Sequence, residues 1–507
     1  MPSNDKKNKP ENDQKPEENN GYKDLEVTTQ NLKTILGINT DVIFREVLIR
    51  NREDLKVSFI FVDGLVDSKS ASDYILKPLM QEERFDLCMT YDEAMKLLEH
   101  GVVYNAAMKK REKMEDLLTD LLTGSTVIVF DSEKTAFSFE VKGFDKRGID
   151  EPTGENVIKG AKDSFIEVIR TNTATCRRKI KSPDLVIKEM VVGKQSKTPV
   201  ALVYLKGIAN KKLVDEVKKR LDSINIDRAI TSGYIEEFII DDKYSAFPQV
   251  MSTERPDRFC SNISDGRVGL IIDGLPTAFI IPGTLLQFIQ APEDYSQHFL
   301  VSSVIRFIRF ISMAITLVLP GFYVSATTFH QEMLPTELAF SIVASKEGVP
   351  FPMFVEVFLL LIAFELLVEA GLRLPKTIGQ TVSIVGALVV GQSAVQAKLV
   401  SPATVVIIAV TAIASFTMPN QDLSNALRLW RFGITVLSSI IGIFGMTLGL
   451  VLLLYHWCKL ETFGVPYLDP LVASEDLQLQ DTLFRFPLFT MIKRPKELNP
   501  YNKKRME

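Results

Sequence analysis

The chain has 507 residues, a formal net charge of -4 and 46% hydrophobic residues. That length predicts several domains, and the near-neutral total gives no indication of a nucleic-acid partner, so none is expected. The charges are unevenly distributed, because nearly all of them precede Phe299 or follow Cys458. This distribution predicts a soluble domain fused to a membrane domain.

Residues 1–22 contain lysine, glutamate, asparagine and proline but almost no apolar side chain. Such a segment cannot bury enough surface to become ordered, and it lacks the apolar core of an export signal. We therefore expect a disordered cytoplasmic tail.

The soluble part contains an internal repeat. Residues 41–65 resemble residues 184–208 at a shift of 143 positions, and residues 124–137 resemble residues 266–279 at a shift of 142. A repeat of this length predicts a duplicated domain rather than a solenoid unit.

Each copy has two β-rich segments, a glycine turn, helical segments and a last pair of strands. The predicted fold is therefore two tandem duplicated α/β subdomains, at 23–146 and 184–290, joined by a helical connector at 147–183. Arg177 and Arg178 end the connector helix. We interpret them as a solvated helix end, which the helix dipole favours, in preference to an anion-binding pair.

Chemical motifs are absent from this part of the sequence. It has no phosphate-binding loop, no HExxH and no GxSxG, and the four cysteines of the whole chain have no zinc-binding spacing. Asp131 and Asp273 are matched in the repeat, but each lies between two strands, as a turn residue would. We expect no enzymatic activity, no cofactor and no metal site.

Residues 291–460 predict an α-helical multi-span membrane domain, because about 20 apolar residues cross a bilayer. Four or five hydrophobic helices are expected, at 299–327, 351–371, 383–397 (the weakest), 403–418 and 433–458. Small residues in the third and fourth segments allow close helix packing, which suits an oligomer.

Lys and Arg place the soluble domain and the C-terminal tail, 461–507, on the same side of the membrane. Five full spans would instead place the soluble domain and the tail on opposite sides of the membrane. The conflict is removed if 383–397 and 403–418 count as one crossing, or if one is re-entrant, which leaves four full spans and a partial one.

The second apolar segment contains three glutamates, Glu356, Glu365 and Glu369. A charge at the bilayer centre costs about 2.5–3.5 kcal/mol, so such groups face protein or water. At helical spacing, Glu365 and Glu369 share one face and Glu356 points to the opposite one. Arg306 and Arg309 are candidate partners for the acids on one face, and the acids on the other face could line a polar path. Snorkelling of the two terminal glutamates is an alternative. On the polar-path hypothesis, Glu365→Gln should weaken ion release and leave assembly intact.

The sequence resembles the A subunits of GerA-type spore germinant receptors over nearly its whole length. The segments that carry the resemblance are DGLVD (63–67), EPTGENVIKG (151–160), IRTNTATCRRKIKSPDL (169–185), YLKGIA (204–209), TERPD (253–257), PEDY (292–295), EGVPFPMFVEVF (347–358), EAGLRLPKTIGQTVSIVGALVVGQSAVQAKLVSPA (369–403), ASFTMPN (414–420) and FGVPYLDPL (463–471). The family usually has an acid where this chain has Gln392, which removes one candidate pore-lining charge.

The resemblance implies a subunit of the spore inner membrane with its large N-terminal domain in the cytoplasm. It implies a transporter-like B subunit and a lipoprotein C subunit as partners, with membrane lipids around the helices. It also implies homo-oligomerisation into a nutrient-gated ion channel that triggers germination. The alternative is a secondary transporter, or a related spore membrane protein, with a soluble regulatory domain. Transporters often contain repeats among their spans, and this repeat lies in the soluble part.

Overall fold

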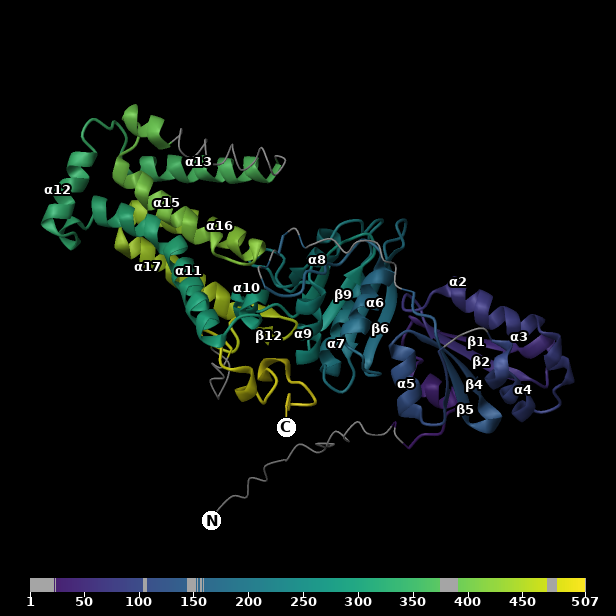
Figure 1. The fold of residues 1–507 in the computed structure, drawn as a ribbon. Coiled ribbons are helices and arrows are strands. Elements are labelled where there is room, and N and C mark those ends of the chain that lie inside the picture. Colours follow the sequence, from purple (N-terminus) through teal and green to yellow (C-terminus); the bar gives the residue numbers. More distant parts are fainter. Residues whose placement is uncertain are drawn as a thin grey trace, which may run out of the picture.

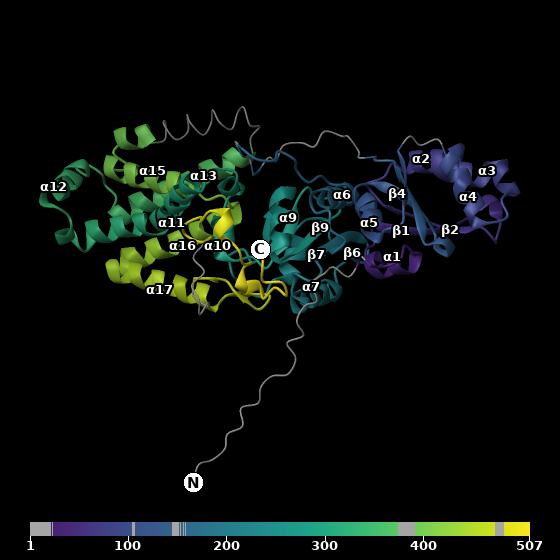
Figure 2. The ribbon, with the colours of Figure 1, turned by 60° about the horizontal axis from the view of Figure 1, so that its bottom comes forward.

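The structure is a computed structural model. It describes residues 22, 24–103, 107–143, 152, 154, 155, 157, 159–373, 391–471 and 481–506. Figures 1 and 2 show a first sheet, a second sheet and a helical region in a row, in chain order. Almost all of the predicted disordered tail at 1–22, and most of the weak apolar segment at 383–397, lie outside the described residues.

The first sheet is antiparallel and has the order β1-β2-β4-β5-β3. Its strands are β1 (Val42–Leu48), β2 (Lys56–Val62), β3 (Met108–Arg111), β4 (Ser125–Phe130) and β5 (Thr135–Glu140). Helices α1 (Thr29–Leu36) and α5 (Met114–Leu122) cover one face, and α2 (Ser68–Ala71), α3 (Lys77–Gln81) and α4 (Tyr91–Leu97) cover the other. Strand β4 is buried on both faces, which explains its continuous apolar run.

The second sheet has the corresponding order, β6-β7-β9-β10-β8. Its strands are β6 (Leu185–Val192), β7 (Thr198–Leu205), β8 (Met251–Thr253), β9 (Val268–Ile272) and β10 (Ala278–Ile281). Helices α6 (Ile169–Lys179) and α9 (Pro256–Asp265) pack on one face, and α7 (Lys211–Ser223) and α8 (Gly233–Ile239) pack on the other.

The repeat-matched aspartates occupy matching positions. Asp131 Oδ1 accepts a hydrogen bond from the Thr29 amide at 2.6 Å, and Asp273 Oδ1 accepts one from the Ile169 amide at 3.1 Å. Thr29 and Ile169 are the first residues of α1 and α6. Each aspartate therefore accepts from an amide at a helix N-terminus that has no partner within the helix, in addition to its place at a strand end.

A buried ion pair joins the two sheets. Arg177 is fully buried, and its guanidinium donates to both carboxylate oxygens of Asp41 at 2.8 and 2.9 Å. The amide of Thr40 also donates to the carbonyl of Ile187 in β6 at 3.0 Å. The interpretation of Arg177 as a solvated helix end is wrong, because the Asp41 carboxylate reaches it from the other sheet.

The helical region contains α11 (Phe299–Thr328), α12 (Thr336–Ser345), α13 (Met353–Arg373), α15 (Pro402–Phe416), α16 (Gln421–Ile441) and α17 (Ile443–Lys459). Among the described residues, α11 is the one helix that is long and apolar enough to cross a membrane by length and composition. Helices α11, α13 and α15 lie where the sequence predicted hydrophobic helices.

The predicted single helix at 433–458 is wrong, because the chain turns sharply at Gly442, where φ is +65°. Helices α16 and α17 form a hairpin instead (Figure 1). A Cβ at Gly445 would lie 2.0 Å from the carbonyl oxygen of Leu437, and one at Gly449 would lie 3.0 Å from Ile434 Cγ1. These glycines allow the two helices to approach closely.

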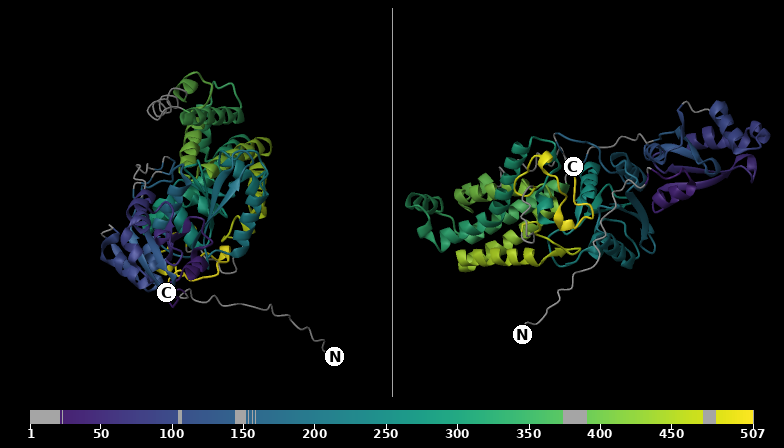
Figure 3. Two further views of the ribbon diagram at one scale, coloured as in Figure 1. Left: turned by 90° about the vertical axis from the view of Figure 1, so that its right-hand side faces the viewer. Right: turned by 90° about the horizontal axis from the view of Figure 1, so that it is seen from below.

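After α17 the chain returns to the second sheet. The amide of Leu285 donates to the carbonyl of Tyr467 at 2.9 Å, and the amide of Tyr501 donates to the carbonyl of Ile208 at 3.1 Å. Figure 3 shows the C-terminal segment beside the α/β part, at the same end of the helical region. The C-terminal tail and the α/β domain thus lie at the same end of the helical region.

Candidate functional site

The three glutamates of α13 have three different surroundings. Glu356 is fully buried, and its Oε2 accepts hydrogen bonds from the Ser401 amide at 2.8 Å and from Thr404 Oγ1 at 3.1 Å. Ser401 is the N-cap of α15. Glu356 therefore places a negative charge at the positive end of a helix, which gives it a structural function.

Glu365 forms ion pairs with two arginines of α16. Its carboxylate lies 2.6 Å from Arg431 Nη2 and 3.1 Å from Arg428 Nη1. The Arg431 side chain is fully buried, whereas Glu365 retains 27% exposure. The two arginines and the glutamate together carry one excess positive charge. Because both of its oxygens contact an arginine, the Glu365 carboxylate is engaged within this chain.

Glu369 and Gln392 are exposed on the surface of the helical region. Glu369 follows a stripe of exposed apolar side chains on α13, Leu359, Ile362 and Leu366, which expose 46%, 40% and 65% of their surface. The spacing of three or four residues places all four side chains on one helical face. This outward face of α13 is available to lipid, to another chain or to a water-filled path.

Arg306 and Arg309 do not pair with the glutamates. Arg309 Nη1 lies 2.8 Å from Asp294 Oδ2, and Arg306 pairs with Asp294 at 3.2 Å and with Asp481 at 2.8 Å. Both arginines lie in the first half of α11, where Asp294 of the preceding segment and Asp481 of the C-terminal tail converge. Figure 1 shows this end of α11 next to the α/β domain. The predicted pairing is wrong because α13 packs beside Tyr323 and Val324, near the other end of α11.

Sequence reasoning missed four of the residues in these networks. Asp294 lies in the quoted PEDY segment, and Arg428 and Arg431 were not proposed as site residues. The spacing of the two arginines, three residues apart on one helix face, was an available signal. Asp481 had no sequence signal, because it is 175 residues from Arg306.

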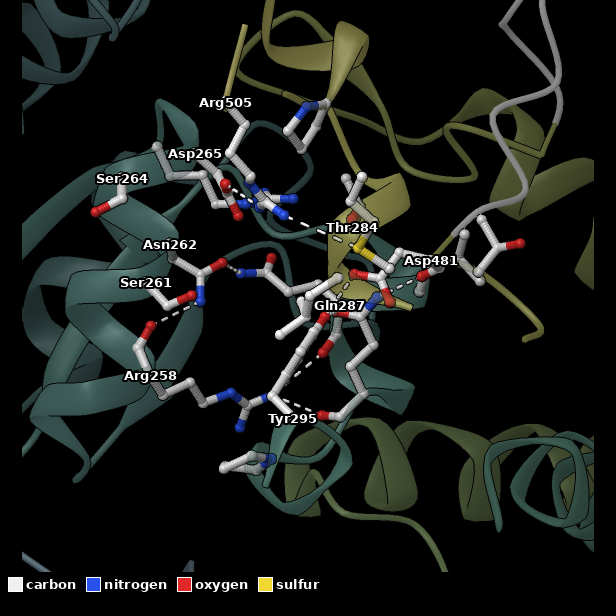
Figure 4. A pocket seen from close by; sticks show the side chains of 18 of the residues that line it. Arg258, Ser261, Asn262, Ser264, Asp265, Thr284, Gln287, Tyr295, Asp481 and Arg505 are labelled. Atoms are coloured by element: carbon white, nitrogen blue, oxygen red, sulfur yellow. Dashed lines mark hydrogen bonds and ion pairs between the residues drawn. The ribbon is translucent and has the colours of Figure 1, made fainter. Parts of the chain in front are cut away.

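A cleft of about 600 Å³ lies beside the Arg306 network. It is bounded by α9, by the segment at 284–296 and by the C-terminal tail, and Figure 4 shows polar side chains from all three around it. Volumes of this size are typical of small-molecule sites. Burial raises the pKa of the Glu497 carboxyl in its wall, and burial lowers the pKa of the Arg267 guanidinium.

Within the part of the chain that the structure describes, no three His, Cys, Asp or Glu side chains are grouped so that they could hold a metal ion.

The sequence profile of the Bacillus/Clostridium GerA spore germination protein family matches residues 30–497. Spore germination protein KA of Bacillus subtilis is 40% identical over 93% of this chain and 86% of its own length. Spore germination protein B1 of the same organism is 38% identical over 94% of this chain and 98% of its own. The crystal structure of the N-terminal domain of the A subunit of the Bacillus megaterium spore germinant receptor GerK3 is 32% identical. It covers 52% of this chain and 98% of that one, with a TM-score of 0.41.

Proposed function

We propose that this chain, which belongs to the Bacillus/Clostridium GerA family of spore germination proteins, is the A subunit of a nutrient germinant receptor in the spore inner membrane. The observation that carries the proposal is the extent of the match. The family profile covers residues 30–497, so both the α/β part and the helical region belong to it. The two α/β subdomains would derive from one duplicated unit, which their equal strand order supports.

The helical region would cross the membrane several times, with the α/β domain in the cytoplasm. The chain enters α11 from the second sheet and returns to that sheet after α17. If the helices span a bilayer, this return requires an even number of crossings.

The subunit would act without enzymatic activity, together with a transporter-like B subunit and a lipoprotein C subunit. It would assemble with further copies into a nutrient-gated ion channel. Of the three α13 glutamates, Glu356 is fully buried, Glu365 is partly buried beside two arginines, and Glu369 is exposed. We therefore assign the candidate conduction path to the outward face of α13, with Glu369 as its charged group. Nutrient binding would bias a closed-to-open equilibrium of the complex.

The test is deletion of the gene in its spore-forming host, followed by measurement of monovalent cation release after addition of a panel of nutrients. Loss of the response to one nutrient class, restored by the intact gene, supports the receptor. An unchanged response to every nutrient argues against it and favours the alternative, a transporter or related membrane protein. Direct binding of a nutrient by the purified chain, coupled to its transport in vesicles, would identify the transporter.

A further inference from the structure

Within the part of the chain that the structure describes, Arg267 is a buried cation without an ion-pair partner. It follows Gly266, which ends α9 with φ at +107°, and it precedes β9. The residue is 5% exposed, and its Nη1 donates to the carbonyl of Pro282. Among the described residues, no carboxylate forms an ion pair with its guanidinium.

The neighbouring acids do not compensate this charge fully. Asp265 is engaged by Arg505 from the C-terminal tail. Glu497 lies close enough to favour the charged form of Arg267, but burial raises the pKa of its own carboxyl and disfavours its anion. An arginine remains protonated in proteins, and a buried charge without a partner is costly. Asp257 and Asp481 also line the cleft, but they pair with Arg255 and Arg306. Among the described residues, Arg267 is therefore left without a paired carboxylate.

The cleft of about 600 Å³ gives a ligand access to this cation. Lys493, which is exposed, supplies a second positive charge to the cleft wall. Gln287, which is 5% exposed, also lines the cleft, and its buried Oε1 has no hydrogen-bond partner in the described structure. Figure 4 shows Gln287 between α9 and the C-terminal tail.

We propose that this cleft binds a small oxyanion, a phosphate or carboxylate group, with Arg267 as the principal counter-charge and Lys493 as the second. Guanidinium groups bind such oxyanions through two parallel hydrogen bonds. A hydroxyl or protonated oxygen on the ligand would donate to Gln287 Oε1. The oxyanion can come from a free metabolite or from a phospholipid headgroup, because the cleft lies next to the entry of α11. This proposal does not depend on the receptor function.

The experiment uses the full-length chain in phosphatidylcholine nanodiscs and equilibrium dialysis with radiolabelled inorganic phosphate and, separately, acetate. The variants are Arg267→Met and Lys493→Met, with Arg228→Met as the control, because Arg228 is exposed and lies outside the cleft. A second experiment repeats the phosphate measurement in nanodiscs that contain phosphatidylglycerol in place of phosphatidylcholine. There, an anionic headgroup in the cleft would reduce phosphate binding by the wild type but leave the variants unaffected.

We expect saturable binding of one anion per chain, at least tenfold weaker binding in Arg267→Met, a smaller loss in Lys493→Met and none in the control. If Arg267→Met does not fold, Lys493→Met and Gln287→Met carry the test, since Lys493 is at the surface and methionine nearly preserves the volume of glutamine. The proposal is overturned by the absence of saturable binding of both anions in phosphatidylcholine. It is also overturned by equal binding in the wild type and all cleft variants.

Discussion

Arg309 of α11 lies 2.8 Å from Asp294, and the carboxylate that it contacts is 2% exposed. Arg306, one helical turn earlier, shares the same carboxylate and also reaches Asp481 in the C-terminal tail. The segment before α11, α11 itself and the distant C-terminal tail therefore meet at one charged network. It ties the first transmembrane candidate to the α/β domain and to the tail.

Asp294→Asn removes the anion that two buried guanidiniums share. Leaving a buried charge without its partner costs about 3–5 kcal/mol, so we expect a strongly lowered Tm of the purified full-length chain. The control is Asp92→Asn, because the Asp92–Lys96 pair is 59% and 65% exposed and such pairs contribute about 0–1 kcal/mol. Equal effects of the two substitutions would show that the Asp294 network does not stabilise the fold.

Most of the helices could be predicted from the sequence, whereas the partners in the charged networks could not. Helix α11 was predicted because one continuous apolar run contains it, and the repeat predicted two α/β units because its matched residues keep their order. The break at Gly442 was missed because apolar side chains continue on both sides of it, so hydropathy does not change there. The partners of Arg306 were missed because ion pairs between distant segments depend on tertiary packing, which periodicity does not encode.

Glu365→Gln should destabilise the helical region, contrary to the expectation that assembly would be intact. The substitution leaves Arg428 and Arg431 without their shared carboxylate, and Arg431 is fully buried. We expect a loss of about 2–3 kcal/mol, at the low end for a buried pair because Glu365 is partly exposed. The measurements are the Tm of the purified chain and its amount in spore membranes by immunoblot. Unchanged values for both would mean that the ion pairs contribute little.

Glu369→Gln should leave the amount and Tm of the protein unchanged, because Glu369 is on the exposed face of α13. If the conduction path follows that face, loss of its charge slows cation release after nutrient addition by up to about tenfold, a barrier change of about 1.4 kcal/mol. Leu366→Ala, on the same face but uncharged, is the control. Normal release from Glu369→Gln spores with wild-type protein levels would exclude this carboxylate from the path.

Glu236 in α8 predicts a pH dependence of stability. Burial raises the pKa of its carboxyl from 4.5 to about 7, with additional contributions from the negative charges of Asp422 and Glu237. Between these two pH values the folded chain binds more protons at this site than the unfolded chain. Its contribution to stability is therefore fully present below pH 4.5 and is lost as the pH rises towards 7.

Glu236→Gln keeps the side chain neutral at every pH, so the variant should lose this part of the pH dependence. Between pH 5 and 8 we expect the wild type to lose up to about 3 kcal/mol relative to the variant, at 1.36 kcal/mol per pKa unit. Thermal unfolding of both proteins across that range measures the difference, with Glu53→Gln, at an exposed site in the first subdomain, as the control. Parallel pH profiles for the wild type and Glu236→Gln would show that the carboxyl is solvated in the folded protein. In that case α8 would not bury it against the start of α16.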